Sequence, residues 1–220
     1  MSQVKERPIL FSAPMVRAIL EGRKTVTRRE VKKKAALDCL ASGFEPAFLT
    51  LPGNSDLCPY GKPGDRLWVR ETWYCDHFEV MRGPYLKPDD LDIGEAIDDG
   101  TLVYAADGLT PYEADQPIWK PSIHMPRWAS RILLEITDVR VERLQDITEE
   151  QALAEGIVGV PFRPDDGWPI CTGYMVGPDD GKTGLQTTAA KAFAGLWDSV
   201  GGEWQANPWC WVVEFKRVTP

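Results

Sequence analysis

Residues 129–144 constrain the fold most, because they carry the clearest β pattern in the chain. Aliphatic side chains recur throughout this run, which favours a strand. We predict one bent strand, or two strands with a kink near Thr137 and Asp138. Shorter strands are expected over residues 8–11, 65–73, 101–106 and 209–218, and helices over residues 13–21, 148–155 and about 193–200. Gly22 can end the first helix, and a capping box at Thr148–Gln151 opens the second. This mixture predicts an α+β fold, with the strands at 8–11 and 209–218 in one sheet.

Glycine and proline are concentrated in two segments, 38–64 and 158–186, and both are predicted to be mostly loop. A third segment, from about residue 75 to 118, is strongly acidic, and only residues 101–106 within it resemble a strand. The sequence shows no internal repeat, and it contains no linker that would separate two cores. We therefore predict one domain over residues 1–220, with insertions at about 75–118 and 158–186.

The charge is distributed unevenly along the 220 residues. The first 34 residues carry a net charge of +7, whereas the remaining 186 carry −15. Proteins that bind duplex nucleic acid usually present a broad basic face, which this distribution does not provide. We expect a small anionic ligand or a short single-stranded nucleic acid, and no duplex DNA. Lys32, Lys33 and Lys34 are interpreted as a solvated face.

The composition, 43% hydrophobic and 26% charged, is typical of a globular protein. No apolar run is long enough for a membrane helix, and the first residues lack the apolar region of a signal peptide. A cytoplasmic protein without a membrane partner is expected. The five cysteines form no Cys-x-x-Cys pair, which indicates reduced thiols. Cys75 and His77 alone are a weak metal signal, so neither a metal nor another cofactor is predicted.

Residues 22–29, Gly-Arg-Lys-Thr-Val-Thr-Arg-Arg, follow the first predicted helix and combine groups that can act on a substrate. Lys24 precedes Thr27 by three residues, and a neutral amine can take the proton of a hydroxyl and make it nucleophilic. The arginines can hold an anionic or carbonyl-rich ligand through several parallel hydrogen bonds. The alternative is a solvated basic turn that ends a helix.

Four segments, taken in order, resemble the ASCH domain family. They read Gly22-x-Lys24-x-x-Thr27-x-Arg29, Gly64-Asp65-x-Leu67-x-Val69, Ile147-Thr148-Glu149-Glu150-x-Ala152-x-x-Glu155-Gly156 and Trp211-Val212-Val213-Glu214-Phe215. The resemblance implies a PUA-like fold, a small β-barrel with helices beside a cleft, and a link to RNA and modified-nucleoside chemistry. Thr27 stands where the usual family signature has glutamate, as in the branch that includes bacterial N4-acetylcytidine amidohydrolase. The chain is about twice as long as the compact amidohydrolases of this branch. With its Ser122-Ile123-His124-Met125-Pro126-Arg127-Trp128 segment, it resembles the ASCH proteins often carried by phages and prophages.

This resemblance implies that Lys24, Thr27 and Glu155 are catalytic. In one scheme Thr27 attacks the acetyl carbonyl, Lys24 moves the proton, and Glu155 orients the lysine or activates water. In an equally consistent scheme Glu155 is the general base on a water molecule and Lys24 polarises the carbonyl. An unperturbed lysine, with a pKa of about 10.4, is a poor base at neutral pH. Burial or a cationic neighbour has to lower the pKa of Lys24, and contact with Glu155 would raise it.

Several other side chains are candidates for substrate binding, because aromatic residues interleaved with basic ones can stack a nucleobase. The candidates are Arg28, Arg29, Trp68, Arg70, Glu71, His124 and Arg127. The alternative is ordinary packing for the tryptophan and a structural role for the histidine. Trp197 and Trp211 are interpreted as core residues.

The function expected from these observations is hydrolysis of a modified nucleoside or nucleobase, most like N4-acetylcytidine deacetylation. The expected partner is a small modified nucleoside or a short single-stranded RNA. One alternative is a non-catalytic module that binds RNA or single-stranded nucleic acid through the basic N-terminal segment. Another is an RNA-cleaving enzyme that uses the same cleft, with Lys24 and Arg29 stabilising phosphate charge. The sequence does not indicate an oligomeric state.

Overall fold

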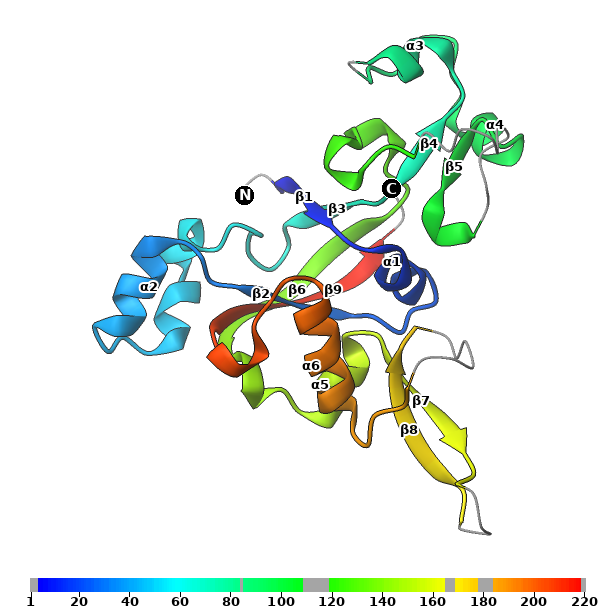
Figure 1. Ribbon diagram of the computed structural model, residues 1–220. Helices are drawn as coiled ribbons and strands as arrows, with labels where there is room; N and C mark the ends of the chain where they lie inside the picture. The colour runs from blue at the N-terminus through cyan, green and yellow to red at the C-terminus, as the bar shows by residue number, and fades with distance from the viewer. Residues whose placement is uncertain (1–3, 84, 109–118, 165–168, 178–183, 219–220) are drawn as a thin grey trace.

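A five-stranded sheet forms the centre of the computed structural model, which describes residues 4–83, 85–108, 119–164, 169–177 and 184–218 (Figure 1). The strands, in spatial order, are β1 (Glu6–Leu10), β3 (Arg66–Arg70), β6 (Leu133–Arg143), β9 (Trp209–Val218) and β2 (Val26–Glu30). The β1–β3 pair is parallel and the other three pairs are antiparallel. The fold is mixed α+β, and the prediction that the first and last strands share a sheet is confirmed.

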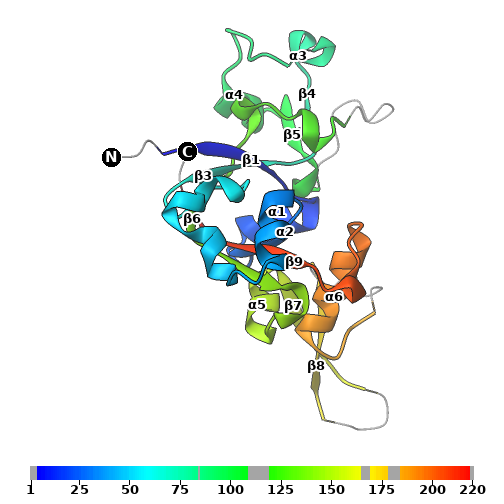
Figure 2. The same ribbon diagram turned by 90° about the vertical axis from the view of Figure 1, so that its left-hand side faces the viewer.

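The β6–β9 pair runs through the middle of this sheet. Its register shifts between Ile136 and Asp138, so of the two predicted alternatives the structure has one strand with an irregularity at Thr137, and not two strands. One extra residue in a ladder bends the strand and increases its twist. Figures 1 and 2 show the two long strands crossing the molecule together, with helices on either side.

The largest core lies between this sheet and the N-terminal helices. Helix α1 (Ala13–Leu20) begins after Ser12, has proline in its first turn, and buries Val16 and Ile19. Aliphatic side chains of β3, β6 and β9 meet it, together with Phe11. Segment 38–64 was predicted to be mostly loop, which is wrong in part. It contains the end of α2 (Lys34–Ala41) and two 3-10 helices, η1 (Pro46–Thr50) and η2 (Pro52–Leu57).

The two edge strands, β1 and β2, are not joined to each other by backbone hydrogen bonds among the described residues, so no closed barrel is seen. A side chain connects them instead. Arg29 on β2 donates a hydrogen bond from Nη2 to the carbonyl oxygen of Leu10, the last residue of β1, at 2.6 Å. Its guanidinium also lies over the ring of Phe11, 5.2 Å from the centroid. Arg29 therefore links the open edges of the sheet.

A second core packs below the sheet and carries the C-terminal helix. It joins α5 (Glu149–Ala154) and α6 (Ala189–Ser199) to a hairpin of β7 (Ile157–Phe162) and β8 (Cys171–Val176). The prediction of a loop over residues 158–186 is therefore wrong where this hairpin lies. Gly159 and Gly173 interrupt the alternation of side chains that would have indicated strands. Figure 1 shows the hairpin extending away from the sheet.

The acidic insertion forms a third, smaller cluster, drawn at the top of Figures 1 and 2. Its elements are β4 (Trp73–Cys75), α3 (Phe78–Arg82), α4 (Ile93–Asp98) and β5 (Leu102–Tyr104). The strand predicted within 101–106 is present, but the prediction that little else is ordered there is wrong. Trp73, Tyr104 and Met125 are buried at the centre of the cluster, and residues 109–118 lie outside the described part.

The remaining elements are short 3-10 helices that connect the strands and helices above. They are η3 (Ala105–Asp107), η4 (Ser122–His124), η5 (Arg127–Ala129), η6 (Leu144–Asp146) and η7 (Trp204–Ala206). In the described part of the chain, no helix has the length and apolar character needed to cross a bilayer.

We expect the chain to unfold as one cooperative unit, because the central sheet uses strands from residue 6 to residue 218. Limited proteolysis should cut within 75–118 or 158–186 while the fragments remain associated in size-exclusion chromatography. Release of a stable, separately folded half would contradict the single-domain prediction.

Candidate active site

The segment from Gly22 to Arg29 links the end of α1 to β2. Gly22 adopts a positive φ of 74° and ends the helix, as the sequence predicted. The backbone N–H groups of Arg23 and Lys24 both donate to the carbonyl oxygen of Ala18, which turns the chain sharply. β2 then pairs with β9, so that Thr27 lies opposite Val213.

Lys24 is buried completely and bound to Glu155. The Nζ atom donates to Glu155 Oε2 at 2.6 Å, to the Glu155 carbonyl oxygen at 2.9 Å and to the Val26 carbonyl oxygen at 2.8 Å. The side chains of Lys24 and Glu155 are 0% and 2% exposed. Lys24 is therefore not part of a solvated basic turn, which was the alternative interpretation of the sequence.

Helix α5 places Glu155 beside Lys24. A capping box at Thr148 and Gln151 starts the helix, as predicted, and Glu155 is its C-terminal cap. Gly156 follows with a φ of 102°. A Cβ at Gly156 would lie 3.1 Å from Cβ of Ala18 and 3.6 Å from Cβ of Lys24. Glycine is thus needed both for the turn and for the close approach of α5 to the end of α1.

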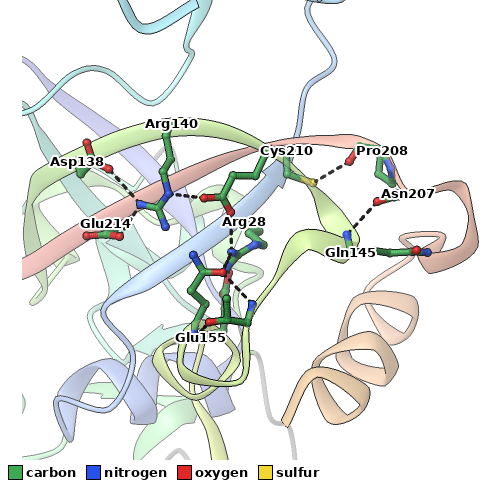
Figure 3. A network of polar contacts seen from close by, with 12 residues as sticks. Arg28, Asp138, Arg140, Gln145, Glu155, Asn207, Pro208, Cys210 and Glu214 are labelled. Carbon is green, nitrogen blue, oxygen red and sulfur yellow. Dashed lines mark hydrogen bonds and ion pairs between the residues drawn. The ribbon is translucent and has the colours of Figure 1, made fainter. Parts of the chain in front are cut away.

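Arg28 holds the other side of Glu155 (Figure 3). Its Nη1 lies 3.4 Å from Glu155 Oε1, and its Nη2 donates to Gln151 Oε1 at 2.8 Å and to Glu142 Oε2 at 3.0 Å. Glu142 in turn accepts from Arg140, which also contacts Asp138 and Glu214. Both Nη atoms of Arg28 are therefore engaged by protein groups, whereas its Nε is buried without a partner in the described structure. The substrate-binding role of Arg28 stays a prediction.

Two observations define the protonation state of Lys24. Burial lowers the pKa of Lys24 below its usual value, and the Glu155 carboxylate opposes this effect without outweighing it. A neutral amine has two N–H groups and an ammonium has three, and three acceptor oxygens surround Nζ. The hydrogen bonds therefore fit the ammonium form, with a pKa that is nevertheless lower than that of an exposed lysine.

A cleft of about 640 Å³ opens beside this ion pair, within the usual size range of small-molecule sites. Thr27 and Glu155 line it, whereas Lys24 is not among the described residues that do so. Thr27 is buried, and its hydroxyl has no hydrogen-bond partner within the described ranges. The other lining residues are Met15, Arg28, Arg29, Glu30, Lys32, Lys33, Pro59, Tyr60, Phe193, Leu196, Trp197, Val200, Gly201, Gly202 and Trp211.

Aromatic side chains of this cleft were not assigned to the site by the sequence. Trp197 and Trp211 were interpreted as core, and both are in fact buried, but each also has a face on the cleft. Tyr60 comes from the segment predicted to be mostly loop. Lys32 and Lys33, interpreted as a solvated face, lie at the cleft as well. Trp211 pairs with Arg29 between β9 and β2, which places this tryptophan beside the motif.

Five of the predicted substrate-binding residues do not line the cleft. Trp68 is 8% exposed and lies under the guanidinium of Arg70, 4.8 Å away. Arg70 also donates to the carbonyl oxygen of Met125 at 3.0 Å. These two residues belong to β3, which is separated from β2 by β6 and β9 in the sheet.

The other three are also held by neighbours away from the cleft. Glu71 is bound to Arg131 at 3.0 Å, and burial raises the pKa of this carboxyl group although Arg131 opposes the effect. Arg127 forms an ion pair with Glu6 at 2.9 Å. His124 lies on η4, and its ring centroid is 6.3 Å from that of Tyr85. Among the predicted binding residues, Arg28 and Arg29 alone line the cleft in the described structure.

Within the described ranges, no group of three or more His, Cys, Asp or Glu side chains is arranged to hold a metal ion. All five cysteines are free, and Cys75 is buried in β4, where burial raises the pKa of its thiol. His77 pairs with Asp90 at 3.4 Å.

Comparisons with protein-family models, with curated proteins and with solved structures found no match for this chain.

The wall that α6 contributes to the cleft depends on Gly202. A Cβ at this position would lie 2.2 Å from Nε1 of Trp197, and a rigid indole cannot move aside easily. We expect Gly202→Ala to lower the free energy of unfolding by about 1–3 kcal/mol through overpacking. Gly195→Ala, on the exposed face of the same helix with nothing within 4 Å, should leave it unchanged or raise it by up to about 1 kcal/mol. Urea denaturation measures both, and equal effects would contradict the packing of Trp197 described here.

Proposed function

We propose that this chain is an ASCH-like hydrolase that removes an acyl group from the exocyclic nitrogen of a modified nucleoside, most like N4-acetylcytidine. The observation that carries the proposal is the buried Lys24–Glu155 contact of 2.6 Å, made by residues 131 positions apart, with Thr27 at the adjoining cleft. These are the three residues to which the ASCH resemblance assigns catalysis. The volume and the aromatic walls of the cleft suit one nucleoside better than an extended polymer.

A purely structural role for the ion pair is a weaker explanation. Removing two charges from water costs several kcal/mol for each ion, and apolar residues of similar volume often fill such a space with equal stability. Glu155 is moreover part of the cleft wall, so one member of the pair can meet a ligand. Residues with a perturbed pKa, such as Lys24, cluster at functional sites, which supports a role in proton transfer.

In the proposed reaction, the Thr27 oxygen bonds to the acyl carbonyl carbon, and its proton passes to the Lys24–Glu155 pair. The C–N bond then breaks, the nucleoside nitrogen receives a proton, and the acyl group remains on Thr27 as an ester. Water deprotonated by Glu155 hydrolyses this ester and releases the carboxylic acid. Because Glu155 lines the cleft and Lys24 lies behind it, the geometry favours Glu155 as the group that meets water or substrate.

The PUA-like architecture is part of the same proposal. A mixed sheet with helices beside a cleft is consistent with a small barrel-like domain, although its edge strands are not paired. The hydrogen bond from Arg29 to Leu10 supports a barrel-like arrangement, because it joins β2 to β1 across the gap. The five-stranded sheet also includes three of the four segments that resemble the ASCH family.

We expect Thr27→Ala and Glu155→Gln each to lower the turnover of N4-acetylcytidine by at least about 100-fold. Lys24→Met should do the same, and it is preferable to Lys24→Ala because it fills the buried volume. Thr27→Ser keeps the hydroxyl and should retain part of the rate. Lys34→Ala removes an exposed lysine and should retain full activity. Mass spectrometry of the products from purified protein measures each rate.

The same assay separates the alternatives. Full activity in Thr27→Ala would exclude the covalent scheme and leave attack by water that Glu155 activates. A wild-type protein that hydrolyses no acylated nucleoside, but binds short single-stranded RNA with salt-sensitive affinity, would replace the proposal with a binding module. Cleavage of that RNA would identify the third possibility, an RNA-cleaving enzyme.

A further inference from the structure

Among the described residues that line the cleft, Tyr60 alone carries a hydroxyl that the catalytic scheme does not use. It lines the same cleft as Thr27 and Arg29, and its ring packs partly against the main core. The phenol hydroxyl forms no hydrogen bond within the described part of the chain, whereas Tyr104 donates to the carbonyl oxygen of Ala129 at 2.9 Å. Tyr60 thus offers the cleft a hydrogen-bonding group that no protein group occupies.

Arg29 lies close enough to Tyr60 for the two groups to interact electrostatically. The Arg29 guanidinium is held by Leu10 and Phe11, but its Nε is buried and has no partner in the described structure. A buried donor without an acceptor destabilises the protein, because the donor has lost its hydrogen bond to water. A ligand with an acceptor atom at this position would restore a hydrogen bond to this donor.

The hydrogen-bonding groups of the cleft change along β2. Side chains alternate along a strand, so Thr27 and Arg29 share a face, about 7 Å apart for two residues of rise. The Glu155 carboxylate lies at the Thr27 end of this wall, and it is already bound by Lys24 and Arg28. Arg29 and Tyr60 interact electrostatically, and they offer the cleft two donors, the buried Arg29 Nε and the Tyr60 hydroxyl. The Glu30 carboxylate also lines the cleft and lies 3.7 Å from Nζ of Lys32. Burial raises the pKa of Tyr60, although Arg29 opposes this, so the phenol is a neutral donor at physiological pH.

We propose that Tyr60 and Arg29 bind the base of the substrate, and that the Tyr60 hydroxyl determines specificity by donating to an acceptor on that base. The matching chemical class is a pyrimidine with a 2-oxo group, whose O2 and N3 edge presents acceptors. In such a base the exocyclic nitrogen lies on the same edge, beside N3 and at the opposite end from O2, so that binding of O2 by Tyr60 directs the exocyclic nitrogen toward Thr27. This assignment depends on the proposed function for its substrate, but base recognition can be measured separately from hydrolysis.

The test compares Tyr60→Phe with the wild type, because this change removes the hydroxyl and keeps the ring. We expect KM for N4-acetylcytidine and Kd for cytidine to rise about 3- to 10-fold, the usual effect of losing one hydrogen bond, with kcat changed less than about 2-fold. The preference for N4-acetylcytidine over N6-acetyladenosine should fall by a similar factor. Tyr174→Phe is the matched control, because Tyr174 lies on β8 outside the cleft lining and has no side-chain hydrogen bond among the described residues.

Each outcome decides one question. Unchanged KM, Kd and base preference in Tyr60→Phe would overturn the role of Tyr60 even if the wild type is an active hydrolase. Weaker cytidine binding in Tyr60→Phe, with no hydrolysis by any variant, would support base recognition while the proposed reaction fails. A wild type that binds neither cytidine nor its acylated form would overturn both. Circular dichroism of each variant checks that the fold is retained.

Discussion

The buried contact between Lys24 and Glu155 is the interaction on which the arrangement of the site depends. It joins the turn after α1 to the end of α5, and Arg28 extends it to β6 through Glu142. Breaking a buried pair by removing one partner typically costs about 3–5 kcal/mol, because an uncompensated charge remains inside. The contact therefore constrains three elements at once, and it also places a carboxylate at the cleft.

Strand β2 serves both the structure and the cleft. Arg28 binds the charged network that Figure 3 shows and also borders the cleft, which Thr27 and Arg29 line as well. Arg29 also bridges to β1 through Leu10, in the place where backbone pairing is missing. A short arginine-rich strand can thus hold a sheet edge together and equip a ligand site, so its basic character does not require nucleic-acid binding.

The sequence predicted the parts of the site that are encoded locally. Gly22 as a helix end, the capping box at Thr148 and the bend of β6 follow from side-chain chemistry within a few residues. Glu155 could not be placed beside Lys24 by any local pattern, and only the family resemblance connected them. Tyr60 and Trp197 escaped prediction for a related reason, since tertiary packing alone brings residue 60 and helix α6 to β2. The hairpin of β7 and β8 was missed because glycine and proline inside strands look like loop signals.

The sequence left two proton-transfer schemes open, one in which Lys24 moves the proton and one in which Glu155 is the general base. The direct contact between the two side chains makes these schemes similar in the structure. Without a ligand, three acceptor oxygens hold Lys24 as an ammonium, and Glu155 faces a cleft that water can enter. In the proposed reaction, a substrate that fills the cleft would remove this water, and lower polarity would disfavour the charged form of Lys24. The proton of Thr27 would then be taken up across the 2.6 Å contact between Glu155 and Lys24. Under this proposal the pair acts as one base whose strength depends on cleft occupancy.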